Sequence, residues 1–396
     1  MKKAAIAGFG VVGGGVADIL VRNAAHIEKK AGERIELGYI VDLRDFPGNP
    51  YEDRLVKDFS VVENDPDVAV VVEAIGGSGV ALQFCTRALK AGKSVVTSNK
   101  QLVAEHGVEL IRLAKEHGVN FLFEASVGGG IPLLHPLNRC LAANEITEVS
   151  GILNGTTNYI LTQMLENGAD YADALRQAQK LGYAEADPTA DVDGIDAGRK
   201  ACILADLSFG KNVSPESVSM EGISKITAID TQFAEKAGMK VKLLGRAIRR
   251  EEGEYVFVCP HFIGNDVLLS GVGDVFNAAV VRGGEVGEVL FYGPGAGRFP
   301  TASAVVGDVI DIVANPGRPQ PADWSEEPAQ LCSAEDFPAQ FYIRTRQARS
   351  AVEEKLGEVR WLPDTNGWHG AIVPKTTKKN ILTSGLAIEA CWPVYE

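Results

Sequence analysis

The sequence lacks the patterns from which metal centres, disulfide frameworks and membrane spans are built. Its six cysteines lie far apart without a CxxC pair and its six histidines are scattered, which gives poor support to a zinc site or a disulfide framework. No stretch reaches the roughly 18 uninterrupted apolar residues of a membrane span. Glycines and Asp18 interrupt the apolar run that follows Lys2 and Lys3, so this run does not indicate a signal peptide. We expect a reduced, cytoplasmic protein.

An excess of positive charge is also missing. The chain has 39 Lys and Arg against 52 Asp and Glu, a formal net charge of −13. This balance argues against nucleic acid or an anionic membrane as the main partner and favours a small molecule. A length of 396 residues, 45% of them hydrophobic and 23% charged, is typical of a soluble globular protein with two or three domains.

The N-terminal segment has the order strand, glycine turn and helix. An apolar strand leads into GFGVVGGG, which satisfies G-x-G-x-x-G at Gly8, Gly10 and Gly13. In this motif the first glycine makes a tight turn, the second lets the backbone approach a pyrophosphate, and the third allows close helix packing. We predict a dinucleotide site in the turn formed by Gly8, Phe9, Gly10, Val11, Val12 and Gly13.

The next strand, IELGYIVD, ends at Asp42, where a carboxylate can accept hydrogen bonds from a ribose diol. Asp42 lies further along than the usual ~20 residues, which we attribute to the insertion RNAAHIEKKAGER. An ordinary turn residue is the alternative. Asp42 would repel a 2′-phosphate and Arg44 would attract one, so both NAD and NADP stay open.

Apolar strands then alternate with amphipathic helices up to NFLFEAS. This alternation predicts a parallel sheet covered by helices on both faces. Ligands in such sheets bind beyond the carboxyl ends of the strands. The residues expected there are Gly76, Gly77, Thr97, Ser98, Lys100 and the segment 124–130.

An acidic run, LGYAEADPTADVDGIDAGRK, lies in the middle of the chain. Its DVDG imitates a calcium loop, but with Gly194 in sixth place the twelfth is Lys200, where calcium needs a bidentate glutamate. A solvated turn is the usual alternative. Asp193 is predicted to cap a helix whose first turn holds Asp196, so that Asp196 and Lys200 share one face. From the residues alone, an exposed salt bridge explains this pair better than a site.

Seven segments occur in one order over the first 310 residues: GFGVVGGG, VVVEAIGG, VVTSNKQLVAEHG, FEASVGGGIPLLHPL, GILNGTTNYILTQM, LGYAEADPTADVDGIDAGRKACILA and GPGAGRFPTASAVVGDVI. Through them the sequence resembles the homoserine dehydrogenase family. The resemblance implies NAD(P)-dependent interconversion of L-homoserine and L-aspartate 4-semialdehyde, a step in threonine, methionine and isoleucine biosynthesis. The alternatives are a nucleotide-sensing regulatory protein without turnover and a dehydrogenase for another amino-acid aldehyde.

The resemblance also implies roles for single residues. Lys200 resembles the catalytic lysine and Lys100 a second active-site lysine. The other implied residues are Glu185, Asp191 and Asp196 for substrate, Gly182 and Gly297 for cofactor, and Glu124, Val127, Gly129 and Ile131 for a monovalent cation, sodium. Gly155 and Thr156 fit the lining of a substrate pocket, although helix capping explains that segment nearly as well. The chemistry agrees, because an oxyanion needs a nearby cation or proton donor, and a substrate ammonium needs carboxylates.

We therefore expect an α/β protein with four parts. They are a Rossmann-type dinucleotide-binding domain with a parallel sheet (1–130 with about 298–316), an α+β substrate and dimerisation domain (131–297), a linker (317–337) and a shortened or divergent ACT-like α+β tail (338–396). The tail lacks the PGVL ligand turn of longer family members, so we expect it to serve packing or assembly rather than threonine regulation. A homodimer is implied by the resemblance.

Overall fold

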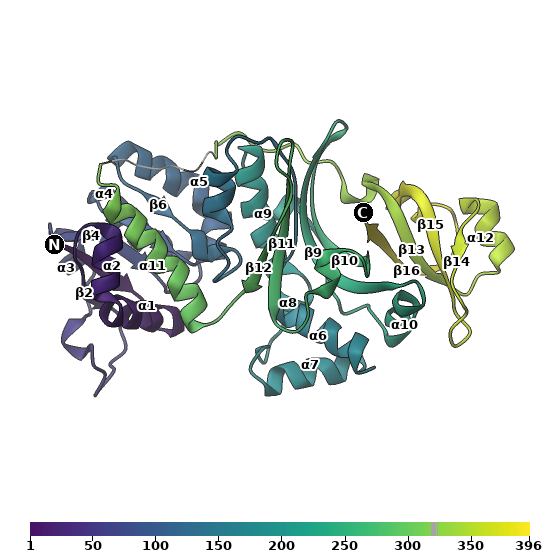
Figure 1. Cartoon of the computed structure of the whole chain (residues 1–396), viewed down its shortest axis with the longest axis horizontal. Helices are drawn as coiled ribbons and strands as arrows, with labels where there is room; N and C mark the ends of the chain where they lie inside the picture. Colours follow the sequence, from purple (N-terminus) through teal and green to yellow (C-terminus); the bar gives the residue numbers. More distant parts are fainter. Residues whose placement is uncertain (318–321, 323) are drawn as a thin grey trace. The chain divides into compact units, whose positions relative to one another are not determined.

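The computed structural model describes residues 1–317, 322 and 324–396, and the chain divides into two compact units (Figure 1). Unit 1 comprises 1–144, 206–215 and 293–328, and unit 2 comprises 145–205, 216–292 and 329–396. The predicted linker includes residues 318–321 and 323, which lie outside the described residues. The predicted domain limits at 130, 297 and 337 stay a prediction. In the described part of the chain, no helix is both long and apolar enough to cross a bilayer.

Unit 1 contains a six-stranded sheet with the strand order β3-β2-β1-β4-β5-β6, and all its strand pairs are parallel. The strands are β1 (Lys2–Ala7), β2 (Ile35–Val41), β3 (Leu55–Val56), β4 (Val68–Glu73), β5 (Ser94–Thr97) and β6 (Phe121–Leu122). This is the strand order of a dinucleotide-binding fold. The chain first adds strands on one side of β1 and then, from β4 onward, adds them on the other side. The predicted Rossmann-type parallel sheet is confirmed.

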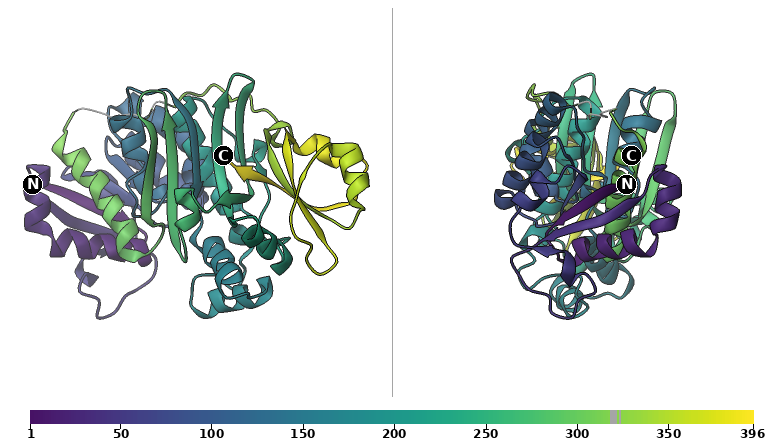
Figure 2. Two further views of the ribbon diagram at one scale, coloured as in Figure 1. Left: turned by 45° about the vertical axis from the view of Figure 1, so that its right-hand side comes forward. Right: turned by 90° about the vertical axis from the view of Figure 1, so that its left-hand side faces the viewer.

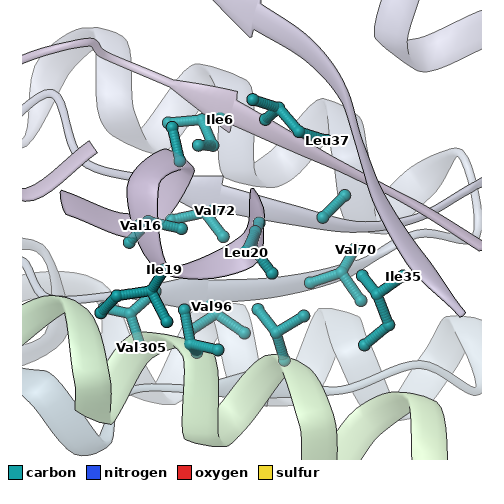
Figure 3. Packing of buried hydrophobic residues seen from close by; sticks show 14 of the residues in the cluster. Ile6, Val16, Ile19, Leu20, Ile35, Leu37, Val70, Val72, Val96 and Val305 are labelled. Atoms are coloured by element: carbon teal, nitrogen blue, oxygen red, sulfur yellow. The ribbon is translucent and has the colours of Figure 1, made fainter. Parts of the chain in front are cut away.

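Helices cover both faces of this sheet. On one face lie α1 (Val11–Arg22), α2 (Ala24–Ala31) and α11 (Arg298–Ala314). Figure 3 shows their apolar side chains packed on the strands, with Val16 of α1 beside Val72 of β4 and Val305 of α11 beside Ile19 of α1, all in one hydrophobic cluster. The helices α4 (Gly79–Lys90) and α5 (Lys100–His117) pack on each other beside β4 and β5, and a short α3 (Ser60–Asn64) precedes β4. The helix α11 therefore packs on the sheet of unit 1, while the predicted assignment of about 298–316 to the dinucleotide-binding domain stays a prediction.

Part of the predicted linker is anchored in unit 1. Trp324 is 3% exposed and packs so closely on α5 that a Cβ atom added at Gly107 would lie 2.5 Å from its ring. Its indole nitrogen donates to Asn212 Oδ1 at 3.3 Å. Burying a large aromatic side chain stabilises the fold by a few kcal/mol, roughly 1.5–3 for side chains of this kind. Trp324 thus contributes to the core of unit 1.

Unit 2 contains a ten-stranded sheet with the order β12-β11-β7-β9-β10-β16-β13-β15-β14, in which β8 also pairs with β10. The strands are β7 (Ile146–Ile152), β8 (Ser219–Met220), β9 (Met239–Arg250), β10 (Gly253–Gly264), β11 (Phe276–Gly283), β12 (Gly287–Pro294), β13 (Pro338–Thr345), β14 (Arg360–Trp361), β15 (His369–Thr377) and β16 (Ile388–Tyr395). The helices are α6 (Gly155–Glu166), α7 (Tyr171–Lys180), α8 (Thr189–Val192), α9 (Ile195–Phe209), α10 (Ala228–Lys236), α12 (Arg349–Leu356) and α13 (Lys378–Leu382). The long strands β9 and β10 form an antiparallel hairpin.

The last strand, β16, joins the C-terminal strands to the rest of this sheet (Figure 2). It pairs in parallel with β10 at Phe262↔Val394 and Ile263↔Tyr395, and antiparallel with β13. Phe257 of β10 and Phe341 of β13 belong to one hydrophobic core. The segment 338–396 therefore packs as an extension of the middle sheet, while its ACT-like character stays a prediction.

Candidate active site

The glycine turn between β1 and α1 has a shape that only glycine fits at two of its positions. Gly8 has φ +96°, and a Cβ there would lie 2.6 Å from the Ala74 carbonyl oxygen; a Cβ at Gly13 would lie 2.0 Å from the Gly8 oxygen. At Gly10, the N-cap of α1, an added Cβ would meet nothing within 4 Å. The turn is thus tightly packed on the protein side and open at the helix N-terminus, where an anionic phosphate is stabilised.

A cavity of about 540 Å³ adjoins this turn, a size typical of small-molecule sites. Among the residues that line it are Gly8, Gly10, Asp42, Arg44 and Lys57. Sequence reasoning missed Lys57, which follows β3 and has no motif around it. Its Nζ donates to the carbonyl oxygens of Leu43 and Arg44 at 3.0 and 2.6 Å.

Asp42 and Arg44 are paired with each other. Arg44 Nε and Nη2 donate to the two carboxylate oxygens of Asp42 at 3.0 and 2.8 Å, and the Phe9 nitrogen donates to Asp42 Oδ2 at 2.8 Å. The Arg44 guanidinium, followed by the backbone donors, holds the pKa of Asp42 well below its ordinary value despite partial burial. Asp42 is therefore ionised and fixed to the glycine turn at the end of β2.

The ends of β4 and β5 carry the remaining residues predicted for the cofactor. Gly76 and Gly77 have φ +86° and +67°. Thr97 is fully buried and donates to Glu73 Oε2 at 2.5 Å, so it fixes the strand end instead of facing open space, and half-buried Ser98 follows it. Lys100 begins α5, which Asn99 caps by accepting from the Leu102 nitrogen at 3.1 Å. A lysine in the first turn of a helix opposes the helix dipole, a local cost typical of functional positions.

The turn predicted to hold a cation, 124–131, is closely packed and hydrogen-bonded. The buried Glu124 carboxylate accepts the backbone N–H groups of Leu133, Leu134 and His135, and burial raises its pKa. A Cβ at Gly129 would lie 2.4 Å from the Gly295 oxygen. The carboxylate is thus occupied by the protein backbone. Within the described residues, no cluster of three His, Cys, Asp or Glu side chains forms a metal centre, so any cation here would depend on backbone carbonyls, as the resemblance implies.

Asp196 and Lys200 form a buried ion pair on α9. Lys200 Nζ lies 2.7 Å from Asp196 Oδ2, with side-chain exposures of 10% and 7%, and it also donates to the Leu153 carbonyl at 2.7 Å. The alternative of an exposed surface salt bridge is therefore wrong. Ions removed from water carry a desolvation cost, which explains why each charge here has several polar partners.

Asn154 connects this pair to a second carboxylate, that of Asp191. The sequence did not indicate that Asn154 belongs to the site. Asn154 Nδ2 donates to Asp191 Oδ1 at 2.7 Å and to Asp196 Oδ2 at 2.9 Å. Its Oδ1 caps α6 by accepting from the Thr157 nitrogen at 2.8 Å. The sequence NGTTN predicts the helix cap formed by Asn154 but not its hydrogen bonds to the two carboxylates. The structure thus brings together Asp191, Asp196 and Lys200 in unit 2, whereas Lys100 and the dinucleotide turn belong to unit 1.

The prediction that Asp193 caps the helix of Asp196 is wrong. Asp193 is exposed and ends α8 as its C-cap. Gly194, with φ +83°, follows it, and its carbonyl accepts the Gly198 nitrogen at 2.8 Å. A left-handed glycine between the two helices lets the chain turn sharply, and α9 begins at Ile195, two residues after the predicted cap.

The other residues predicted for the substrate or cofactor lie outside this buried network. Glu185 and Gly182 are exposed on the loop after α7, and Gly297 is the N-cap of α11. Thr156 Oγ1 donates to the Tyr183 carbonyl at 2.6 Å, which ties that loop to α6. A Cβ at Gly155 would lie 2.6 Å from the Val275 oxygen. Their proposed roles stay predictions.

A second buried lysine lies under α6. Lys242 Nζ donates to Asn158 Oδ1 at 3.0 Å and to the Val272 carbonyl at 2.6 Å. Burial, together with the smaller effect of the Lys240 charge, lowers its pKa to about 8. Asn158 lies one helical turn after Asn154, and its amide contacts Lys242 directly, whereas the amide of Asn154 contacts Asp196, the partner of Lys200. Only the Lys200 pair includes a carboxylate among these contacts, which makes it the better candidate for chemistry on a charged substrate.

Comparison with known proteins gives the family. Residues 132–310 match the family model described as homoserine dehydrogenase, and residues 8–124 match that of its NAD binding domain. The chain is 45% identical over 315 residues to homoserine dehydrogenase of Pseudomonas aeruginosa, covering 78% of this chain and 72% of the relative. The Bacillus subtilis enzyme is 43% identical over 313 residues, with the same coverage. The chain belongs to the homoserine dehydrogenase family.

Solved structures of the family agree over longer stretches. The homoserine dehydrogenase of Thiobacillus denitrificans is 34% identical, with a TM-score of 0.91 over 100% of this chain and 98% of that one. A hyperthermophilic archaeal homoserine dehydrogenase mutant in complex with NADPH is 31% identical, with a TM-score of 0.67 over 79% of this chain and 98% of that one. As a homoserine dehydrogenase, the chain is an oxidoreductase acting on a CH–OH group and has a nucleotide-cofactor domain, as its sequence predicted.

Proposed function

We propose that the chain interconverts L-homoserine and L-aspartate 4-semialdehyde with Lys200 and Lys100 as its catalytic lysines. The observation that carries this proposal is the buried arrangement of Lys200, Asp196, Asn154 and Asp191, in which the Lys200 Nζ–Asp196 Oδ2 distance is 2.7 Å. A solvated turn does not require a buried lysine beside two carboxylates that accept hydrogen bonds from one asparagine amide. An enzyme that handles an amino acid and a developing alkoxide needs both kinds of charge.

The nicotinamide cofactor, when bound, supplies the hydride for the aldehyde carbon and accepts it back from the alcohol. Negative charge then develops on the carbonyl oxygen, and a lysine ammonium compensates it and donates the proton that completes the alcohol. In the reverse direction the same amine removes the hydroxyl proton. Both lysines fit this task, and a second cation nearby would lower the pKa of the lysine that moves the proton.

The substrate ammonium is proposed to lie against Asp191 and Asp196, with Glu185 approaching from the exposed loop after α7. Charge-assisted hydrogen bonds from an ammonium to carboxylates are about twice as strong as neutral ones. Gly155 and Thr156, at the start of α6, would line the same pocket. A dehydrogenase for another amino-acid aldehyde would differ here, in the part of the pocket that contacts the side chain.

The cofactor is proposed to lie along the glycine turn, with its pyrophosphate at the N-terminus of α1. Asp42 is suited to a ribose diol, whereas Arg44 and Lys57, which line the same cavity, are suited to a 2′-phosphate. We therefore infer that both NAD and NADP are accepted. The remaining proposed contacts are Phe9, Val11, Val12, Gly76, Thr97, Ser98, Gly182 and Gly297.

A monovalent cation, sodium, is proposed at the backbone carbonyls of Glu124, Val127, Gly129 and Ile131, since hard cations prefer oxygen ligands. We also propose a cytoplasmic homodimer in which the segment 338–396 serves packing and carries no threonine site. The six free cysteines agree with a reduced compartment. Light scattering of the purified chain, with and without threonine, tests the assembly.

One assay tests the activity and the assignment of Lys200. Cofactor absorbance is followed with homoserine or aspartate semialdehyde, with NAD and with NADP, for wild type, Lys200→Ala and Lys180→Ala. Loss of a general acid–base group lowers kcat about 10²- to 10⁴-fold, and exposed Lys180 at the end of α7 serves as the matched control. A wild type without turnover of either substrate would support a regulatory protein instead. A fully active Lys200→Ala would remove Lys200 from the mechanism.

A further inference from the structure

The neutral side chain of Asn154 contacts two negatively charged carboxylates, those of Asp191 and Asp196. It precedes α6, while Asp191 lies on α8 and Asp196 on α9. The two hydrogens of its amide nitrogen are directed at one carboxylate each, at 2.7 and 2.9 Å. Both donors belong to one planar group, so the spacing of the two carboxylates follows from the position of a single side chain. Donation to both acids also offsets the repulsion between them.

The other end of the amide fixes its orientation. Asn154 Oδ1 accepts from the Thr157 nitrogen at 2.8 Å and from Thr157 Oγ1 at 3.0 Å, and Asn154 is 6% exposed. If the amide were turned over, its oxygen would face two carboxylates and its nitrogen would face a backbone donor. The surrounding contacts therefore leave one orientation, and α6 holds the two acids in register with Lys200.

We propose that Asn154 is a positioning residue that sets the preference of the enzyme for substrates with an α-ammonium group. It acts through Asp191 and Asp196, whose spacing it defines, and through Asp196 on the Nζ of Lys200. This inference rests on the proposed function, in which these acids hold the substrate ammonium. A simple helix cap is the competing explanation, because Asn is among the best N-cap residues.

The exchange Asn154→Asp separates the two explanations. Asp caps helices as well as Asn does and has nearly the same shape, but it replaces the two donors by an oxygen, so three carboxylates converge. We expect kcat/KM for homoserine to fall at least about 100-fold, as small misplacements of catalytic groups do, with an unchanged KM for the cofactor. With 4-hydroxybutanoate, which is an alcohol of the same length without the amino group, the loss should be at least about tenfold smaller.

Two further variants complete the experiment. Asn154→Ser retains a helix cap and adds no charge, but its shorter side chain has one hydroxyl hydrogen in place of two amide hydrogens. It should change the preference in the same direction. Asp170→Asn is the matched control, because it makes the reverse exchange at the N-cap of α7, where Asp170 Oδ1 accepts from the Asp173 nitrogen at 2.9 Å. It should keep the kinetics of the wild type. Thermal melting is recorded for every variant.

The outcomes are distinct. A lower melting temperature with an unchanged preference for homoserine, or an equal loss on both alcohols, would reduce Asn154 to a cap. If Asn154→Asp does not fold, Asn154→Ser decides, and if neither folds the capping role dominates and the proposal fails. A wild type without turnover would instead contradict the proposed function. Calorimetric titration of homoserine into wild type and Asn154→Asp would then still test the ammonium pocket, since a positioning role requires weaker binding by the variant.

Discussion

The glycine turn of unit 1 and the lysine–carboxylate network of unit 2 are built in opposite ways. In the turn, the proposed function depends on the absence of side chains, and the shape is a property of consecutive residues from Gly8 to Gly13. In the network, the proposed function depends on side chains of α8, α9 and the N-cap of α6, and the amide of this N-cap residue, Asn154, connects the two carboxylates. The comparison teaches that the first kind of site is recorded locally in a sequence, while the second exists only after folding.

The largest expected effect concerns the glycine turn. Gly13→Ala places a Cβ at 2.0 Å from the Gly8 oxygen, a backbone clash that overpacks the turn and costs about 1–3 kcal/mol or more. Gly10→Ala meets open space and should fold normally while its methyl group obstructs a pyrophosphate. We expect both variants to bind the cofactor at least about 100-fold more weakly. Thermal melting distinguishes the two variants, because only Gly13→Ala should be destabilised, and calorimetric titration measures cofactor binding by both. Normal cofactor binding by Gly13→Ala would contradict the proposed role of the turn.

The second buried lysine of unit 2, Lys242 under α6, offers a test by pH. The pKa of Lys242 is about 8 in the folded chain, against an ordinary 10.5, so the unfolded chain holds this proton more strongly. The cost of burying the charge is fully present below about pH 8 and is relieved as pH rises toward 10.5.

Lys242→Met removes this dependence. At about 1.36 kcal/mol per pH unit, wild type should gain stability relative to Lys242→Met by on the order of 2 kcal/mol between pH 7 and 9.5. Urea unfolding of both proteins at the two pH values measures the difference, and other titrating groups cancel between them. A pH-independent difference would mean that burial does not lower the pKa of Lys242 in the folded chain.

The proposed cofactor site of unit 1 also includes two side chains, those of Asp42 and Arg44, and in this respect it differs from the glycine turn beside it. Asp42→Ala removes a carboxylate from the cavity and releases Arg44, so the ratio of kcat/KM for NADP over NAD should rise about tenfold, equivalent to about 1.4 kcal/mol. Arg44→Ala should change the ratio in the opposite direction. Steady-state kinetics with both cofactors provide the measurement, and a common direction for both variants would exclude a 2′-phosphate from this position.

The smallest effect concerns the loop after α7. Thr156→Val removes the 2.6 Å hydrogen bond to the Tyr183 carbonyl while keeping the branched shape. We expect about 1 kcal/mol of lost stability and a few-fold rise in KM for homoserine, because the loop carries Glu185. Thr156→Ser retains the hydroxyl group and should restore the wild-type KM. If Glu185 contributes nothing to substrate binding, both variants will have the same KM.

The fold could be predicted almost completely in unit 1 and only partly in unit 2. The period of the apolar strands and the spacing of Gly8, Gly10 and Gly13 are local signals, so the parallel sheet and its turn followed from them. The sequence placed Asp196 and Lys200 on one helix face, but burial decides whether such a pair is a surface contact or a site. Asn154 was visible as a cap, since capping is local, whereas its two carboxylate partners lie 37 and 42 residues away.

The position of β16 has a consequence for synthesis of the chain. This strand lies inside the sheet, between β10 and β13, although it follows both of them in the chain. Ribosomes add roughly 5–20 residues per second, so β10 and β13 both wait with unpaired edges until residues 388–396 emerge. Exposed strand edges are templates for aggregation. A nascent chain stalled before Ile388 should therefore be the form of this protein that most needs a chaperone.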